Sequence, residues 1–322
     1  MLRLNDCRSP DERRMVTMDR ISQLAEPQPR TVTVIIPVYN GERFIRRALD
    51  SVFGQTYPLH QVIVIDDGSK DSTREIVGGE YGERVTLIRQ QNGGPAKARN
   101  AGLRAATGEF IAFLDADDWW EPGKVAGQIQ VLNTHPDAVG NYTGLRMMSD
   151  EGVHLEDIRP ADPNTLWPTL RWCNPSVPPS SVMLRRLALD KLDGGFVERQ
   201  LGSEDWNLWF RLIAKGPFCV CPEPLTNYRS SPDGLSGNAD HMYNDFMKML
   251  DDVLLADLTG LRRALWRRRI ISYQAFKACL TARGAGDKKA EREYMKKSVM
   301  EWPSPFWAPE RFRFFAVTLL RT

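Results

Sequence analysis

Apolar, β-branched segments alternate with amphipathic segments four times between residues 31 and 134, and this alternation restricts the possible folds more than any other feature. The segment 31–38, TVTVIIPV, has the composition of a strand buried on both faces. It is followed by 41–55, GERFIRRALDSVFGQ, whose apolar residues fall on one helical stripe. Such alternation is typical of a parallel sheet with right-handed crossovers. The sequence therefore predicts an α/β fold with a mixed, mainly parallel sheet flanked by helices.

Three further strand and helix pairs follow at similar spacing. The segment 61–67, QVIVIDD, predicts a strand that ends in two acids, and Asp71 is placed to cap the next helix. Pro95 near the start and Gly108 past the end of another segment show the usual asymmetry of a helix. The expected strands are 31–38, 61–67, 85–90 and 109–115, and the expected helices are 41–55, 72–81, 93–108 and 122–134.

The second half of the chain gives weaker signals. The segment 180–186 is compatible with a strand, and 202–216, GSEDWNLWFRLIAKG, predicts a helix with acids in its first turn. The segment 217–229 indicates a strand and a turn, and 241–300 has few helix breakers. We therefore expect three regions, a polar tail over 1–30, an α/β domain over 31–240 and a helical extension over 241–322.

Polar residues follow the predicted strands where each strand ends. Tyr39 and Asn40 come after the first strand, Asp66 and Asp67 close the second, and Asp115 opens an acidic run after the fourth. The carboxyl ends of parallel strands meet at one edge of a sheet, and ligands bind in the crevice outside them. These side chains are therefore expected on one rim although they lie far apart in sequence.

The acidic run FLDADDWWEP at 113–122 indicates what the rim binds. The chain has no G-x-G-x-x-G or P-loop motif that would hold phosphates on a glycine-rich turn. Asp115 and Asp117 would repel a diphosphate unless a cation lay between them, and carboxylate oxygens suit Mg²⁺ or Mn²⁺. We interpret the two acids as a site for a metal that in turn holds a diphosphate. For Asp118, capping of the following helix is an alternative.

Five motifs occur in the order and at the spacings of a known family. They are VTVIIPVYNGERFIRRALDSVFGQTY, VIVIDDGSKDST, GGPAKARNAG, FLDADDWWEP and GSEDWNLWFRL. Over residues 31–235 the chain resembles the inverting glycosyltransferases of family 2, which have the GT-A fold. The resemblance implies a Rossmann-like nucleotide-diphospho-sugar transferase domain followed here by the helical extension.

The resemblance also implies roles for individual residues. Asp117 would be the metal ligand of the D-x-D motif, and Asp205 in SEDW would be the catalytic base. The residues implied in donor binding are Pro37, Tyr39 and Glu42 at the nucleotide, Asp67 at the edge of the base, Arg99, Asp115 near the ribose or sugar, and Arg229 in a loop over the diphosphate.

Each of these roles has a structural alternative. Glu204 and Asp205 could cap the helix that they begin, because acids are favoured in a first turn. Arg229 could be a solvated surface residue. Trp119, Trp120 and Trp206 could stack on sugars or simply pack in the core. The sequence leaves these alternatives open.

The implied reaction is a single displacement in which one carboxylate takes the proton of the acceptor hydroxyl and a metal stabilises the leaving diphosphate. The Q-x-x-R-W signature of processive members does not follow SEDW, so transfer of one sugar per event is expected. The donor is expected to be UDP-linked, and the acceptor is a glycan, a lipid-linked glycan or a protein. The alternatives are an inactive sugar-nucleotide-binding scaffold and a metal-dependent nucleotidyltransferase.

Composition restricts the partners and the compartment. The 322 residues carry a formal net charge of +2, which argues against a nucleic-acid partner. The five cysteines are scattered, and no segment has the character of a signal peptide or a membrane span, so we expect a cytoplasmic protein. The basic segment RRALWRRRIISYQAFK could lie peripherally on the inner face of an anionic membrane or pack on the main domain with its arginines in water.

Overall fold

The computed structural model describes residues 30–164, 171, 177–192, 194–200, 202–230 and 238–303. The predicted tail over 1–30, except for residue 30, lies outside these ranges, and so does the aromatic segment 304–322. Within the described ranges, no helix combines the length and the apolar character that a bilayer crossing requires.

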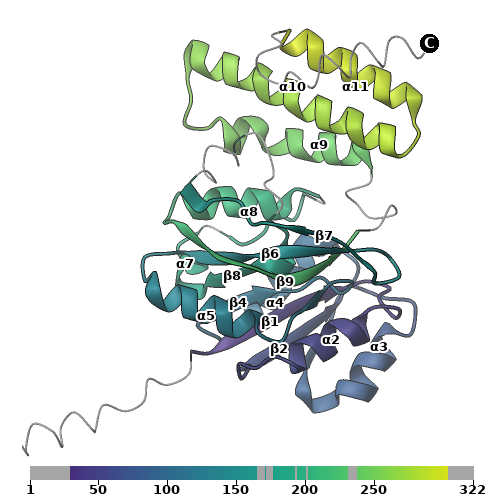
Figure 1. Ribbon diagram of the computed structural model, residues 1–322, viewed down its shortest axis with the longest axis vertical. Coiled ribbons are helices and arrows are strands. Elements are labelled where there is room, and N and C mark those ends of the chain that lie inside the picture. Colours follow the sequence, from purple (N-terminus) through teal and green to yellow (C-terminus); the bar gives the residue numbers. More distant parts are fainter. Residues whose placement is uncertain are drawn as a thin grey trace, which may run out of the picture.

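The first part of the chain forms the predicted succession of strands and helices (Figure 1). Strands β2, β1 and β4 pair in parallel in that order, and β3 extends the sheet beyond β2. The elements are β1 (Val32–Val38), α2 (Ile45–Phe53), β2 (Gln61–Asp66), α3 (Thr73–Ile76) with a π-helical turn (Val77–Tyr81) and a short 3-10 helix (Gly82–Arg84), β3 (Thr86–Arg89), α4 (Pro95–Ala105) and β4 (Phe110–Phe113).

The rest of the sheet is mixed. Strand β8 pairs antiparallel with both β4 and β6, whereas β6 and β9 run parallel. Strand β5 is antiparallel to β9 at the edge, and β7 is antiparallel to β6. The elements are β5 (Trp119–Trp120), α5 (Lys124–Thr134), β6 (Gly140–Met148), β7 (His154–Ile158), a 3-10 helix (Pro179–Ser181), β8 (Val182–Arg185), α7 (Arg186–Asp190), α8 (Glu204–Ile213) and β9 (Phe218–Arg229).

The buried strand β1 shows why the sheet is covered on both faces. On one face of the sheet, the even-numbered valines of β1 and Ile36 pack with the apolar stripe of α2. On the other face, Ile35 packs in the buried cluster that also includes residues of α4. The two-residue period of a strand sends successive side chains to opposite faces, so a strand whose side chains are nearly all apolar needs a helix on each side. Helix α4 can lie close to β1 because Gly102 has no side chain. A Cβ at this position would lie only 2.4 Å from Ile35 Cγ2.

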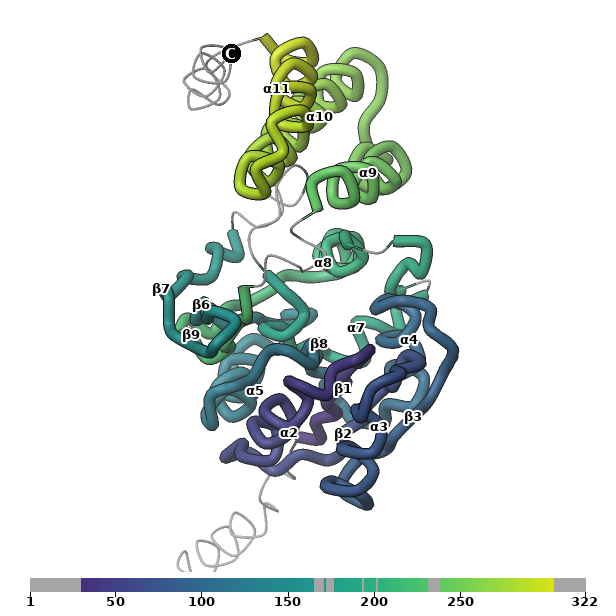
Figure 2. Tube along the Cα trace, turned by 90° about the vertical axis from the view of Figure 1, so that its right-hand side faces the viewer, coloured from purple at the N-terminus to yellow at the C-terminus, as the bar shows by residue number. Residues whose placement is uncertain are grey.

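The predicted helical extension is present as α9 (Ala239–Met249) with a π-helical turn (Leu250–Leu254), α10 (Gly260–Gly284) and α11 (Lys288–Glu301). Figures 1 and 2 show α8 between the sheet and α9. The hydrophobic core does not stop at this border. Phe246, Met249 and Leu254 of the extension belong to the same buried cluster as Trp206 and Trp209 of α8.

Strands β6 and β7 were not predicted from the sequence. Strand β6 contains glycines and Asn141, residues that are depleted in strands, but it is buried between neighbours on both sides. Its ladder with β9 shifts between Thr143 and Leu145, where the stretch from Glu223 to Pro224 bulges out over Gly144. A Cβ at Gly144 would meet backbone atoms at 3.2 Å, so tertiary packing rather than local propensity shapes this strand.

Candidate active site

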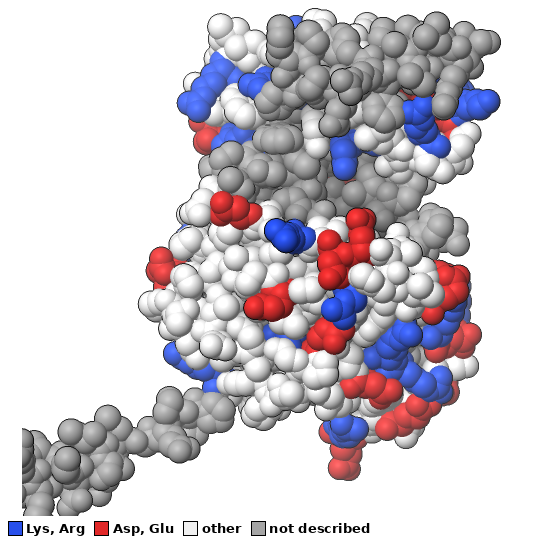
Figure 3. All heavy atoms as spheres, viewed as in Figure 1, with Lys and Arg blue, Asp and Glu red and all other residues white. Residues whose placement is uncertain are grey.

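The ends of β1, β2 and β4 meet at one edge of the sheet, as predicted. The ladder continues beyond the strands, because Asp67 N donates to Val38 O at 2.8 Å and Leu114 N donates to Ile35 O at 3.0 Å. The chain then turns after β4, where Asp118 N donates to Asp115 O at 3.0 Å. Figure 3 shows acidic and basic side chains next to one another on this face of the part of the molecule that contains the sheet.

A buried chain of charges joins Asp115 to the start of α8. Arg99 of α4 is 4% exposed, and it donates to Asp115 Oδ1 at 2.5 Å and to Glu204 Oε1 at 2.7 Å. Burial alone would lower the pKa of Arg99, but the two carboxylates outweigh it and raise this pKa. The predicted donor-binding residues Arg99 and Asp115 are therefore linked to the segment that carries the predicted base.

Asp205 is the second residue of α8, next to this chain of charges. Its Oδ1 accepts a hydrogen bond from its neighbour's backbone, Trp206 N, at 2.6 Å. Burial, and then the charge of Glu204, raise the pKa of Asp205 to about 7, although Arg99 opposes the shift. A carboxyl group with a pKa near the working pH is suited to proton transfer. Glu204 is buried against Arg99, so it does more than cap the helix.

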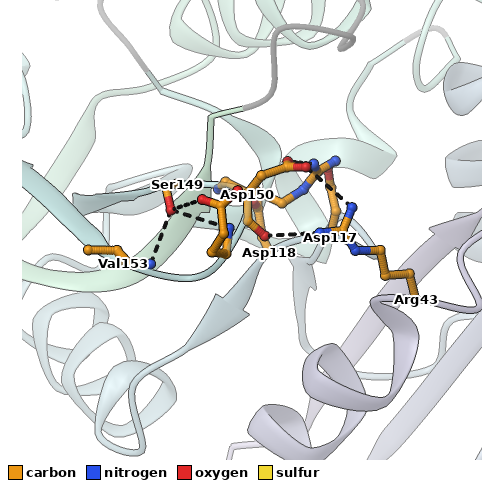
Figure 4. A network of polar contacts seen from close by, with 8 residues as sticks. Arg43, Asp117, Asp118, Ser149, Asp150 and Val153 are labelled. Atoms are coloured by element: carbon orange, nitrogen blue, oxygen red, sulfur yellow. Dashed lines mark hydrogen bonds and ion pairs between the residues drawn. The ribbon is translucent and has the colours of Figure 1, made fainter.

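Asp117 lies in a second ion network, which Figure 4 shows. Arg229, the last residue of β9, donates to Asp117 Oδ2 at 2.6 Å and pairs with Asp150. Arg43 also contacts Asp150, at 3.3 Å. The guanidinium of Arg229 lies 4.2 Å from the ring centre of Phe44, and its side chain is 13% exposed. Arg229 is therefore a fixed partner of the predicted metal ligand and not a solvated surface residue.

Asp118 is buried and fixes the turn after β4. Its Oδ2 accepts from Ser180 Oγ at 2.5 Å, and its Oδ1 accepts from Arg229 N at 2.9 Å. Burial, and then the charges of Asp117 and Asp115, raise its pKa well above the ordinary value. Asp118 thus joins the turn to β9 and to the 3-10 helix before β8, rather than capping the next helix.

The predicted nucleotide-cradling residues form the neighbouring loop. Pro37 is buried within β1, whereas Tyr39 is 47% exposed at the strand end. Glu42 Oε2 accepts from Ser72 N at 2.9 Å, and Asp71 Oδ2 accepts from Glu42 N at 3.0 Å. The loop after β1 is therefore tied to the loop after β2, and Tyr39 presents its ring beside them.

Asp67 is fully engaged by the loop that follows β3. Its carboxylate accepts from three N–H groups, which are Gln90 Nε2 at 2.7 Å, Gly94 N at 2.8 Å and Gly93 N, whose single hydrogen is shared between the two oxygens at N···O distances of 3.0 and 3.2 Å. Both oxygens of this side chain are therefore engaged by the loop. A surface hollow of about 470 Å³ lies beside the loop, lined by Gly68, Lys70, Arg89, Gln90, Gln91 and Asn92.

The tryptophans near the site differ in role. Trp120 is 3% exposed and donates from Nε1 to Ser180 O at 2.8 Å, and Trp206 packs on Phe246 with ring centres 4.6 Å apart. Both therefore pack in the core. Trp119 is partly exposed, with the guanidinium of Arg47 4.0 Å from its ring centre.

The carboxylates fit a divalent cation that arrives with a diphosphate. Asp115 and Asp117 are 26% and 37% exposed, and each has one oxygen on an arginine, Arg99 or Arg229. The described part of the chain contains no cluster of three or more His, Cys, Asp or Glu side chains that could hold a metal. The remaining ligands would have to be phosphate oxygens and water, which is the usual coordination of Mg²⁺ in nucleotide sites.

Two residues that shape this site could not be recognised from the sequence. Asp150 lies in the turn between β6 and β7, and it could not be placed because neither strand was predicted. Ser180 contacts both Asp118 and the backbone N–H of Asp115, at 3.0 Å for the latter. The run PPSS in which it lies has no recognisable motif.

This architecture, with an acidic turn after β4 and a carboxylate at the start of α8, is that of the GT-A fold. A family model described as glycosyl transferase family 2 matches residues 33–192. The chain belongs to glycosyltransferase family 2, as the five motifs predicted.

Curated relatives agree with this membership. The chain is 30% identical over 186 residues to WfaP of Escherichia coli, and the match covers 58% of this chain and 71% of the relative. The name of WfaP describes a β-1,3-glucosyltransferase that uses UDP-Glc and an α-D-GlcNAc-diphosphoundecaprenol acceptor. An uncharacterized glycosyltransferase of Nostoc sp. is 31% identical over 229 residues, which are 67% of this chain and 66% of the relative. Several Rickettsia relatives are matched over less than two thirds of their own length, with 32% covered for one from Rickettsia felis and 58% for one from Rickettsia typhi.

Solved structures show the same fold at low sequence identity. S. aureus TarS 1–349 in complex with UDP-GlcNAc matches with a TM-score of 0.59 and 21% identity, over 83% of this chain and 81% of that chain. The mannosyltransferase PcManGT from Pyrobaculum calidifontis, in complex with GDP-Man and Mn²⁺, matches with a TM-score of 0.54 and 21% identity, over 95% of this chain and 93% of that chain. The predicted fold class is confirmed.

Proposed function

We propose that the chain is an inverting, non-processive glycosyltransferase that moves a sugar from a nucleotide-diphosphate donor to an acceptor hydroxyl. The observation that carries the proposal is the buried chain Asp115–Arg99–Glu204 beside Asp205. It joins the rim of the sheet, where a donor would lie, to a carboxylate suited to proton transfer. The product would belong to a cell-surface polysaccharide or another glycoconjugate.

In this mechanism Asp205 takes the proton of the acceptor hydroxyl as its oxygen attacks the anomeric carbon. The bond from that carbon to the diphosphate oxygen breaks in the same step, and the configuration inverts. Asp205 must stand on the acceptor side of the donor sugar. Arg99 orients both Asp115 and Glu204, because its guanidinium donates to each of these carboxylates. A divalent cation, when bound at Asp117, would supply charge stabilisation to the leaving diphosphate.

The base of the donor would lie between Tyr39 and the loop after β3. Because both oxygens of Asp67 are engaged by that loop, we infer that it acts by holding Gln90 and Gly93 in place at the edge of the base. The TarS complex contains UDP-GlcNAc and the PcManGT complex contains GDP-Man, and the name of WfaP gives UDP-Glc. We propose UDP as the nucleotide, since the relative with the higher sequence identity uses it.

A thermal-shift screen of nucleotide sugars with and without Mn²⁺ tests this proposal. A UDP-sugar should raise Tm in the presence of Mn²⁺, because a ligand that binds only the native state stabilises it. Transfer to an acceptor should then release UDP. Release of pyrophosphate would identify a nucleotidyltransferase instead. Donor binding without turnover on any acceptor, together with a stable protein partner, would identify an inactive scaffold.

The pH dependence of turnover provides a prediction for Asp205. The base must be deprotonated, and its pKa in the free protein is raised to about 7, so we expect kcat/KM to fall as pH drops through 7 and to level off above it. Glu204→Gln should move this acidic limb to lower pH, because it removes a like charge and leaves Arg99 less neutralised. Initial rates between pH 5 and 9 provide the measurement. An unchanged limb in Glu204→Gln would contradict the assignment.

We further propose a lipid-linked acceptor, with the protein at the inner face of the membrane, because the name of WfaP specifies such an acceptor. The described residues 260–303 contain twelve Lys and Arg against four Asp and Glu. Three apolar side chains of helices α10 and α11 in this region are exposed, Leu261 to 76%, Leu265 to 43% and Met300 to 77%. Exposed apolar side chains within a basic helical unit favour binding to anionic lipid.

Co-sedimentation with vesicles tests the membrane contact. We expect binding to vesicles that contain phosphatidylglycerol, weaker binding to pure phosphatidylcholine, and loss of binding at high salt. The double substitution Leu261→Ser and Leu265→Ser should weaken binding about tenfold or more, since each leucine loses apolar burial. Leu187→Ser, at a leucine of α7 that is 64% exposed, is the matched control. Absence of binding at low salt would exclude this contact.

A further inference from the structure

The start of α8, the helix that carries Asp205, is held by a residue of the C-terminal extension. The N-cap Ser203 makes no side-chain capping hydrogen bond, although the first turn of a helix has backbone N–H groups that need acceptors. Asp245 of α9 supplies an acceptor from outside. Its Oδ2 accepts from Gly202 N at 3.1 Å and from Ser203 N at 2.9 Å, and the side chain is 1% exposed.

The charge of Asp245 is compensated within α9. Lys248 Nζ donates to Asp245 Oδ1 at 2.8 Å and also to Arg199 O at 3.2 Å, on the approach to the same loop. A buried carboxylate is stable only when it is paired and hydrogen-bonded, and this one meets both conditions. The arrangement is therefore a defined anchor for Arg199, Gly202 and Ser203.

Two further contacts bring α9 close to this loop. A Cβ on Gly202 would lie 3.0 Å from Met242 Sδ, so glycine at this position allows the approach. On the other side of Asp205, the rings of Trp206 and Phe246 lie 4.6 Å apart. The residues on both sides of the predicted base are thus in contact with neighbouring positions of one helix of the extension. Figures 1 and 2 show α9 directly beside α8.

We propose that Asp245 is a positioning residue for the transfer reaction and that the C-terminal extension is needed to place the base. This inference rests on the proposed function, in which Asp205 accepts the proton. The carboxylate of Asp205 takes its orientation from the adjacent backbone, through Trp206 N. A shift of the helix start would therefore move the carboxylate, and a displacement of about 1 Å can reduce the rate about 10²-fold.

The predicted result is a split between turnover and donor binding. Asp245→Ala should lower kcat about 10- to 100-fold. The KM for the donor and the binding of UDP with Mn²⁺ should stay near the wild-type values, because Asp115, Asp117 and the loop after β3 do not contact Asp245. Asp245→Asn should retain most of kcat, since its amide oxygen can still accept from Gly202 N and Ser203 N.

Asp251→Ala is the matched control, because Asp251 pairs with Arg263 and Arg267 inside the extension. It should keep the wild-type kcat. Amide hydrogen exchange of residues 202–206 provides a readout that needs no turnover, and it should accelerate in Asp245→Ala but not in Asp251→Ala. The wild-type protein could show this exchange pattern but no transfer. The proposed function would then be wrong, whereas the conclusion that Asp245 holds the start of α8 would still be correct.

Full kcat in folded Asp245→Ala, or an equal loss in Asp251→Ala, would overturn the proposal. If Asp245→Ala does not fold, Lys248→Met is measured instead. This variant removes the cation that pairs with Asp245 but keeps the carboxylate of Asp245. A several-fold drop in kcat with faster exchange at residues 202 and 203 would then support the proposal. Wild-type kcat and exchange in Lys248→Met would contradict it.

Discussion

Replacement of Asp205 by asparagine is expected to lower kcat by about 10²- to 10⁴-fold, the usual contribution of a general base. The amide has nearly the shape of the carboxylate but cannot accept the proton of the acceptor hydroxyl. Binding of UDP with Mn²⁺ should remain close to that of the wild type, because Arg99 contacts Asp115 and Glu204, and these contacts do not require the carboxylate of Asp205. Steady-state rates together with calorimetric titration of UDP measure the two quantities separately.

Asp190→Asn is a suitable control for this substitution. Asp190 is the exposed last residue of α7, so its variant makes the same chemical change away from the site. Wild-type turnover in Asp205→Asn would refute the assignment of the base. A parallel loss of UDP binding and turnover would place Asp205 among the donor contacts instead.

The sequence was sufficient to predict the acidic edge of the sheet. Strand composition and helical stripes are local patterns, and parallel topology then brings the ends of distant strands together. For this reason Asp67 and Asp115 could be assigned to one edge before the structure was known. The long helix that begins with Glu204 and Asp205 could be recognised in the same way, from its apolar stripe and its acidic first turn.

The partners of these carboxylates could not be predicted. Arg99 and Glu204 are separated by 105 positions, and only the tertiary fold brings them together. The contacts of Asp67 depend largely on backbone N–H groups of Gly93 and Gly94, which carry no sequence signal of their own. Asp150 was missed because it depends on β6, a strand whose stability comes from its neighbours and not from its composition.

The pairing of Asp117 with Arg229 has a consequence for metal binding. A divalent cation at Asp117, the proposed metal ligand, would compete with Arg229, which already donates to Asp117 Oδ2 from two of its nitrogens. Asp150 and the ring of Phe44 hold the guanidinium in this position. A divalent cation would bind Asp117 at the expense of that contact, and the released guanidinium would lie near the incoming diphosphate.

Asp117→Asn is therefore expected to lower kcat/KM by about 10²- to 10³-fold, the usual effect of losing one electrostatic stabiliser of a transition state. It should also abolish the effect of Mn²⁺ on UDP binding, which calorimetry with and without the cation would show. Asp157→Asn, on the exposed strand β7, serves as the control. Unchanged Mn²⁺ dependence in Asp117→Asn would show that the metal is held elsewhere.

The variant Arg229→Met tests whether Arg229 competes with the metal for Asp117 or instead supports Asp117 as a ligand. Without the guanidinium, Mn²⁺ alone should bind about fivefold more tightly, which corresponds to about 1 kcal/mol for a partly exposed charge pair. The KM for the donor should rise at the same time, because the diphosphate loses a cationic contact. Titration followed by the paramagnetic resonance of free Mn²⁺ measures the first effect, with Arg46→Met, from an exposed pair with Glu80, as control. Weaker Mn²⁺ binding in Arg229→Met would mean that the arginine supports Asp117 rather than competing for it.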